Sequence, residues 1–176
     1  MTYTKRYIDA VKFAAWRHAL NSYDGEPYYV HFEDLEQVLK DHGEDDEESL
    51  IQANLHDVIE DGGCSYNDIK KRFGHDTAEV VYLCTDNKGR NRKERKNQSF
   101  YDEIKNSDVR LQATKIKVTD RIANMRRSLK SNHSMGKAYL KEYAHFKEQL
   151  FVEGHISSMW KELDELTAKI QKNEAQ

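Results

Sequence analysis

The sequence predicts an all-α fold that forms a single domain over residues 1–176. Apolar residues recur at helical spacing in one segment after another, and no stretch shows the strict alternation of a half-buried strand. The whole length contains one Pro and eight Gly, fewer than a turn-rich β fold needs. Hydrophobic residues make up 38% of the chain, enough to bury a substantial core.

Charge and composition exclude several classes of protein. The formal charge of −3 is unlike that of strongly basic nucleic-acid-binding proteins, so no nucleic-acid partner is expected. No apolar run is long enough to span a membrane, and residues 1–7 lack the apolar region of a signal peptide. Cys64 and Cys84 have no metal-type spacing and give no disulfide framework. We therefore expect a cytoplasmic protein without a membrane partner, and leave open whether it forms a homo-oligomer.

The first helix is expected over about 6–20, where apolar residues recur at helical spacing. Turn residues at 21–27 then end it. His31 is expected at the end of this loop, directly before a second helix that carries Leu35 and Val38. A histidine in that position is either an ordinary hydrogen-bonded loop residue or a ligand.

The segment Leu55–Asp61 carries one imidazole and three carboxylates. A helix that runs through this segment to Gly62-Gly63 is predicted from apolar residues spaced about one turn apart, namely Ile51, Leu55, Val58 and Ile59. On such a helix His56 lies one turn from Glu60, and Asp57 lies one turn from Asp61. This set can bind a divalent cation and leave acid groups to activate water. The alternative is a solvated acidic helix end.

Three shorter segments follow. Ser65 and Asp68 have the spacing of a capping box for a helix over 66–72. A further helix is expected over 77–83, and another over 93–104. The last is entered through a basic run that contains Lys88, Arg90, Arg92, Lys93, Arg95 and Lys96. This run either contacts phosphate groups or is a solvated entrance to the helix.

The longest helix is predicted over 107–130, with two more over about 135–152 and 155–172. Lys117, Asp120 and Asn124 fall on one face of the longest helix, at i, i+3 and i+7. A carboxylate in this apolar and basic stripe is costly unless it is paired or bound to a metal. The alternative is a salt bridge from Asp120 to Lys117 or Arg121.

The ordered set His31, His56-Asp57 and Asp120 resembles the HD-domain metal-dependent phosphohydrolases. Four segments are similar to the hydrolase domain of the RelA/SpoT family: residues 25–31 (Gly-Glu-Pro-Tyr-Tyr-Val-His), 55–61, Phe73-Gly74 and 117–126. Three others, residues 85–88, 94–96 and 139–143, look like its small single-domain members of the metazoan SpoT homologue type.

The resemblance implies one Mn²⁺ bound by His31, His56, Asp57 and Asp120. It also implies that Glu60 and Asp61 position and activate the attacking water, and that pyrophosphate leaves the 3′ position of guanosine tetra- or pentaphosphate. Imidazole and carboxylate ligands suit Mn²⁺, although Zn²⁺, Co²⁺ or Mg²⁺ could substitute. A bound metal lowers the pKa of water and polarises a phosphoryl oxygen, and a nearby carboxylate can accept the proton.

The predicted substrate contacts depart from this family in one place. The loop before the Gly-Glu-Pro-Tyr segment usually carries basic residues in the family, but residues 21–24 here are Asn-Ser-Tyr-Asp. Tyr23 is expected to stack on a base, and Lys117 and Asn124 to contact phosphate and base or ribose. Phosphate contacts are also expected from the basic run, through Lys88 and Arg95.

Two alternatives remain open at this point. The same site could act on another nucleotide, such as a deoxynucleoside triphosphate, a cyclic nucleotide or a phosphorylated dinucleotide, because the loop at 21–24 is altered. The chain could also be a catalytically silent nucleotide-binding module. The complete set of four ligand candidates and two acidic helpers argues against that second alternative.

Overall fold

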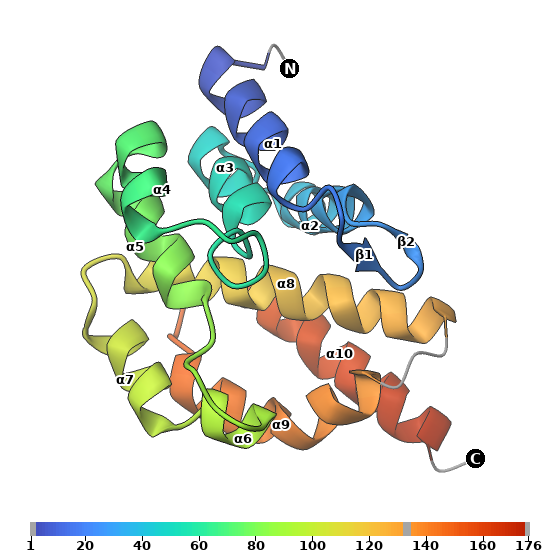
Figure 1. Cartoon of the computed structure of the whole chain (residues 1–176). Coiled ribbons are helices and arrows are strands. Elements are labelled where there is room, and N and C mark those ends of the chain that lie inside the picture. The colour runs from blue at the N-terminus through green and yellow to red at the C-terminus, as the bar shows by residue number, and fades with distance from the viewer. Residues whose placement is uncertain (1–2, 132–134, 175–176) are drawn as a thin grey trace.

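A computed structural model describes residues 3–131 and 135–174, and the α-helices that it contains confirm the all-α class. Helix α8 (Arg110–Ser131) runs through the middle of the molecule (Figure 1). It contacts α2, α3, α5, α7, α9 and α10. The remaining helices are α1 (Lys5–Arg17), α2 (Tyr29–Asp41), α3 (Glu47–Leu55), α4 (Tyr66–Phe73), α5 (His75–Cys84), α6 (Arg92–Arg95), α7 (Gln98–Asn106), α9 (Met135–Leu150) and α10 (Ser157–Glu174).

Side-chain caps fix where several helices begin. Thr4 accepts a hydrogen bond from the backbone of Tyr7 at the start of α1, and Asp46 accepts one from Ser49 at the start of α3. The capping box predicted at Ser65 and Asp68 is present at the start of α4. These bonds satisfy backbone N–H groups that have no partner within the helix.

The prediction of a helix through Asp61 is wrong, because α3 ends at Leu55 and residues 56–61 form consecutive turns. The buried His56 makes contacts with other segments of the chain, and these override the local helical pattern. Backbone bonds from Val58 to Leu55 and from Cys64 to Val58 close the turns. A Cβ on Gly62 would lie 2.8 Å from the Val58 carbonyl oxygen, so glycine is required there for close approach rather than as a helix cap.

Two other predicted boundaries differ from the structure. The helix expected over 93–104 is divided into α6 and α7, because Asn91 and Asn97 each accept a backbone hydrogen bond and start a separate helix. His31 lies in the first turn of α2 rather than in the loop before it. The helix over 107–130 and the two that follow are confirmed within a few residues.

The turn at 21–27 contains a small β-hairpin that the sequence pattern did not predict. Strands β1 (Ser22–Tyr23) and β2 (Glu26–Pro27) pair antiparallel. Asp24 and Gly25 between them both have positive φ, the conformation that a two-residue Asp-Gly hairpin requires. Strands of two residues are too short to show an alternating pattern.

One cluster of buried hydrophobic side chains extends through the described helices, from Tyr7 in α1 to Ile170 in α10. The cluster surrounds α8, which contributes Ala113, Ile116 and Ile122. This core holds α8 in a fixed position against α2 and α3. Among the described residues, no helix is long and apolar enough to cross a membrane.

Candidate metal centre and its cavity

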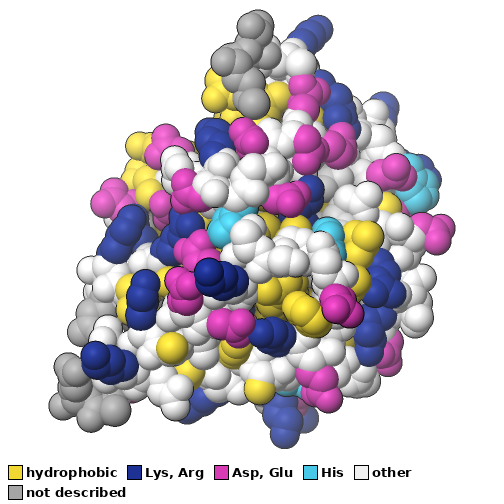
Figure 2. Space-filling model, turned by 180° about the vertical axis from the view of Figure 1, so that it is seen from behind, with side chains coloured by type: hydrophobic (Ala, Val, Ile, Leu, Met, Phe, Trp, Pro, Cys, Tyr) yellow, Lys and Arg dark blue, Asp and Glu magenta, His cyan; other side chains and the backbone are white. Residues whose placement is uncertain are grey.

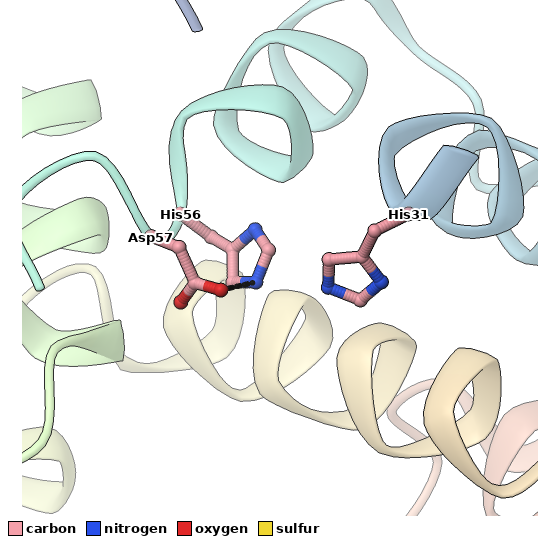
Figure 3. A group of neighbouring side chains, drawn as sticks. All are labelled: His31, His56 and Asp57. Atoms are coloured by element: carbon pink, nitrogen blue, oxygen red, sulfur yellow. Dashed lines mark ion pairs between the residues drawn. The ribbon is translucent and has the colours of Figure 1, made fainter. Parts of the chain in front are cut away.

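Three side chains converge where α2, α3 and α8 meet. His31 comes from the first turn of α2, and His56 and Asp57 come from the turn directly after α3 (Figure 3). One ligand atom from each of these residues lies within 4.8 Å of the others. Segments separated by about 25 residues in the sequence therefore present two imidazoles and a carboxylate to one point.

Asp120 in the middle of α8 completes this set. Its Oδ1 atom lies 3.3 Å from Nε2 of His31 and 3.8 Å from Nε2 of His56. The Nε2 atom of His56 is also 3.0 Å from Oδ2 of Asp57. The four predicted ligands are therefore brought together, and the alternative ion pair does not form in the described structure: Lys117 donates to the Cys84 carbonyl and Arg121 pairs with Glu142.

The donor atoms fit a divalent transition metal. Nδ1 of His56 bonds to the Ala53 carbonyl at 2.8 Å, which directs Nε2 toward the two carboxylates. That Nε2 atom is buried and has no hydrogen bond of good geometry, although both carboxylates are near. A buried imidazole nitrogen between two carboxylates is the environment that a cation would complete. Two nitrogen and two oxygen donors suit Mn²⁺, Zn²⁺ or Co²⁺.

The electrostatics of the four residues agree with this fit. Burial opposes the charged form of His56, but the carboxylates of Asp57 and Asp120 and the Ala53 carbonyl together outweigh burial and raise the pKa of His56 to about 9. Burial likewise opposes ionisation of Asp57 and Asp120, yet the neighbouring histidines hold the pKa of each carboxyl below its usual value. A metal that binds here must displace the proton from His56.

A cavity of about 190 Å³ opens beside the four residues. Four further residues predicted for the site line it, namely Tyr23, Glu60, Lys117 and Asn124. Eight residues that the prediction did not assign to the site also line it: Tyr28, Cys84, Asp86, Arg92, Lys96, Arg121, Tyr139 and Phe146. Tyr28 and Asp86 lie inside the segments that resemble the family, but nothing in the sequence indicates which of their neighbours they contact.

The two acidic helpers lie in different surroundings. Glu60 lines the cavity, and its Oε2 atom accepts a hydrogen bond from the Asp86 backbone at 3.0 Å. Its carboxylate is partly withdrawn from water, which raises its pKa. Asp61 is exposed, as Glu60 is, and burial raises its pKa too, but Asp61 is not among the residues that line the cavity. The geometry therefore favours Glu60 as the group that accepts a proton.

Tyr23 is already engaged by its neighbours. Its ring centroid lies 4.4 Å from that of His31, and its hydroxyl donates to Oδ1 of Asn124 at 3.1 Å. The Arg127 guanidinium lies 5.5 Å from the centre of the same ring. The ring is therefore packed against protein groups, and stacking on a base remains a prediction.

The basic run contributes residues other than those predicted. Lys88 is exposed and lines a neighbouring hollow, and Arg95 does not line the cavity. Arg92 and Lys96 line it instead, because the division into α6 and α7 directs these two side chains inward. The sequence indicated a basic run here but did not indicate which of its members face the site.

The inward-facing cations form a basic wall, defined as Arg92, Lys96, Lys117 and Arg121. Lys96 lies 2.6 Å from Oδ1 of Asp86, and Lys117 lies 4.0 Å from the same atom. Arg92 and Arg121 both pair with Glu142. Four cations thus share two carboxylates, which leaves a local excess of positive charge.

Outside the cavity, acidic and basic side chains are interspersed across the face drawn in Figure 2. The coloured part of that face presents no extended basic stripe of the kind that binds nucleic acid. The described residues on this face therefore show no concentration of positive charge like that of the basic wall.

Comparison with known proteins places this chain in a family. A family model described as HD domain matches residues 10–150. The guanosine-3′,5′-bis(diphosphate) 3′-pyrophosphohydrolase MESH1 of Drosophila melanogaster is 30% identical over 125 residues, which cover 69% of this chain and 68% of that protein. The MESH1 protein of Danio rerio is 30% identical over 123 residues, 68% of this chain and 67% of its own length.

A solved structure agrees with these matches. It belongs to a metazoan orthologue of SpoT described as hydrolysing ppGpp, and it superposes with a TM-score of 0.79 at 25% identity. The superposition covers 96% of this chain and 97% of that one. The chain therefore belongs to the HD-domain family, within the group that includes the metazoan SpoT-type proteins.

Proposed function

We propose that this protein is a metal-dependent hydrolase that removes pyrophosphate from the 3′ position of guanosine tetra- or pentaphosphate and leaves GDP or GTP. The observation that carries this proposal is the convergence of His31, His56, Asp57 and Asp120 at one end of a cavity whose other wall is basic. The relatives named for this reaction support the choice of substrate.

The proposed metal is Mn²⁺, with Zn²⁺, Co²⁺ and Mg²⁺ as alternatives, held by the same four residues. When bound, the cation supplies Lewis acidity to a phosphoryl oxygen and lowers the pKa of a water molecule. Glu60 then accepts the proton of the attacking water, a role that its place in the cavity and its raised pKa support. Asp61 assists from outside the cavity through its negative charge.

Arg92, Lys96 and Lys117 are proposed to bind the phosphate groups. Their positive charge exceeds that of the carboxylates beside them, so an anion would be attracted to this wall. The cavity volume of about 190 Å³ is below the roughly 300–1,000 Å³ usual for small-molecule sites. We infer that the phosphate end of the nucleotide enters the cavity while the nucleoside lies at its mouth, near Tyr23 and Asn124.

A second candidate is hydrolysis of another nucleotide at the same centre. The observation that favours it is the hairpin at 22–27, where Tyr23 packs on His31 and no Lys or Arg is present. A change of the groups beside the nucleoside would alter specificity without altering the metal chemistry. A silent binding module is the weakest alternative, because it would have no need of the metal ligands.

The test is product analysis with purified protein and Mn²⁺. Guanosine tetraphosphate is offered beside deoxynucleoside triphosphates, cyclic nucleotides and phosphorylated dinucleotides. We expect GDP and pyrophosphate from the tetraphosphate only. Turnover of another nucleotide alone would support the second candidate, and the absence of any product together with the absence of bound metal would support the silent module.

Two further proposals concern the chain as a whole. We propose that residues 1–176 form one HD domain, which the shared hydrophobic cluster from α1 to α10 supports. We also propose a cytoplasmic location. Cys64 and Cys84 are both unpaired and buried, as is usual in a reducing compartment.

A further inference from the structure

We propose that Tyr23 and Tyr28 are positioning residues that hold the two carboxylate ligands of the metal centre, one directly and one through Asn124. Both tyrosines come from the short segment 22–28, which contains the β-hairpin and the residue before α2. The inference rests on the proposed metal site. It assigns to this segment the support of the metal, in addition to the place beside the nucleoside that is proposed for Tyr23.

Tyr28 acts on Asp57. Its hydroxyl donates to Oδ2 of Asp57 at 2.5 Å, and that oxygen also lies 3.0 Å from Nε2 of His56. The bond occupies one lone pair of the carboxylate and fixes the rotation of the group. The remaining lone pairs of Asp57 are then presented to the point where the imidazoles of His31 and His56 converge.

The ring of Tyr28 is held in place from behind by His18. The two ring centroids lie 4.2 Å apart with an angle of 8° between the planes, so the rings are stacked. His18 is 2% exposed and neither of its ring nitrogens has a hydrogen-bond partner. Phe32 packs edge-on against both rings. This aromatic packing leaves the Tyr28 hydroxyl little freedom to turn away from Asp57.

Tyr23 acts on Asp120 through one intermediate. Its hydroxyl donates to Oδ1 of Asn124, and the amide nitrogen of Asn124 donates to Oδ1 of Asp120 at 2.5 Å. The Tyr23 bond therefore fixes which end of the Asn124 amide faces Asp120. The same ring packs against His31, so Tyr23 restrains two of the four ligands.

Hydrogen-bond partners of this kind raise metal affinity because the ligands are held in the bound geometry before the metal arrives. Mutation of such a partner typically costs roughly 10–100-fold in affinity or activity. We expect the larger effect at Tyr28, which touches a ligand directly, and a smaller one at Tyr23, which acts through Asn124.

The experiment measures Mn²⁺ affinity by competition with a chelator, without substrate. Tyr28→Phe and Tyr23→Phe each remove one hydroxyl and keep the ring, so the packing is preserved. Tyr66→Phe is the matched control, because the Tyr66 hydroxyl also donates to a carboxylate at 2.5 Å, that of Glu79, but on α4 and α5 away from the centre. Thermal melting of each variant verifies that it is folded.

We expect Tyr28→Phe to weaken Mn²⁺ binding about tenfold or more, Tyr23→Phe to weaken it less, and Tyr66→Phe to leave it unchanged. In an Asn124→Ala background, Tyr23→Phe should add no further loss, because its route to Asp120 is already broken. If the Tyr28 and Tyr23 variants bind Mn²⁺ as tightly as Tyr66→Phe does, the positioning role of the two tyrosines is wrong, and the proposed metal site is unaffected. If the parent protein binds no Mn²⁺, or His56→Ala binds it as well as the parent, the proposed metal site is wrong as well.

Discussion

Two parts of the same cavity are prepared differently for their ligands. One is the metal corner, which consists of His31, His56, Asp57 and Asp120, and the other is the basic wall. In the corner, His56 has a buried nitrogen without a hydrogen bond, and the carboxylates of Asp57 and Asp120 are aligned by outer partners. In the basic wall every cation already has a partner within the protein, chiefly Asp86 or Glu142.

This difference has a chemical consequence. In the corner, Nε2 of His56 has no hydrogen bond, so a cation that binds there would meet groups that folding has already arranged. Each cation of the wall already pairs with a protein group, so an incoming phosphate must compete with two carboxylates for the same cations. We therefore expect substitutions in the corner to abolish the reaction and substitutions in the wall to change substrate affinity.

The largest expected effect tests the corner. His56→Ala or Asp57→Ala should lose bound metal and reduce hydrolysis to the detection limit, a loss beyond the roughly 10–100-fold typical of outer partners. Metal content after dialysis and initial rates measure this. His75→Ala is the control, because that imidazole is exposed, pairs with Asp76 and Glu79 and does not line the cavity. Full activity in either corner variant would show that the ligand assignment is wrong.

The next effect separates proton transfer from metal binding. Glu60→Gln should keep the metal and lower kcat by about 10²–10⁴-fold, because the amide cannot accept a proton. Glutamine retains an oxygen that can accept the Asp86 backbone hydrogen bond, so the loop geometry is kept. Glu79→Gln, in which the carboxylate that bonds Tyr66 is neutralised, is the matched control. An unchanged kcat for Glu60→Gln would remove Glu60 from the proposed mechanism.

A smaller effect is expected in the wall. Arg92→Gln should raise KM about tenfold with little change in kcat, because a charge-assisted bond to phosphate is worth about 1.5–3 kcal/mol. Arg90→Gln and Lys88→Gln should leave KM unchanged, because neither side chain lines the cavity. Steady-state kinetics measure all three. A tenfold rise in KM for Lys88→Gln would support the phosphate contact that the sequence predicts for Lys88. It would contradict the proposal that the basic wall alone binds the phosphate groups.

The smallest effect concerns pH. Burial and the nearby cations Lys117 and Arg92 lower the pKa of Lys96 to about 8, against the opposing effect of Asp86. Lys96 is therefore charged below pH 8 and loses its charge above it, so kcat/KM should decline severalfold on the alkaline side. Lys96→Arg keeps the charge throughout this range and should remove that decline. A pH profile that is the same in both proteins would exclude Lys96 from phosphate binding.

The residues of the corner could be predicted from the sequence because they stand in short and unusual sequence patterns. His56 and Asp57 are adjacent, and Asp120 stands in a stripe where a carboxylate has no ordinary reason to be. The helical pattern likewise predicted α8, because its apolar positions repeat over six turns and its neighbours bury them.

The wall and the outer partners could not be predicted in the same way. Arg92 pairs with Glu142 and Tyr28 bonds to Asp57 across separations of 50 and 29 residues, and no local pattern encodes such pairs. The end of α3 was misplaced for a related reason, since contacts of His56 and Asp57 with distant segments prevailed over periodicity. The division of the predicted helix into α6 and α7 places Arg92 and Lys96 at the cavity, and the periodicity of the sequence did not indicate that division.

Helix α8 carries Lys117, Asp120 and Asn124 on one face, and the helix fixes the spacing of these three side chains along its axis. Seven residues from Lys117 to Asn124 correspond to about 10 Å along the axis at the usual rise of ~1.5 Å per residue. If Asp120 binds the metal and Lys117 binds phosphate, as proposed, the geometry of the helix sets the distance from Asp120 to Lys117 on one side and to the Asn124 amide on the other. In that case, a nucleotide whose scissile phosphate and sugar are spaced differently would not contact both side chains, and α8 would select substrates by their length.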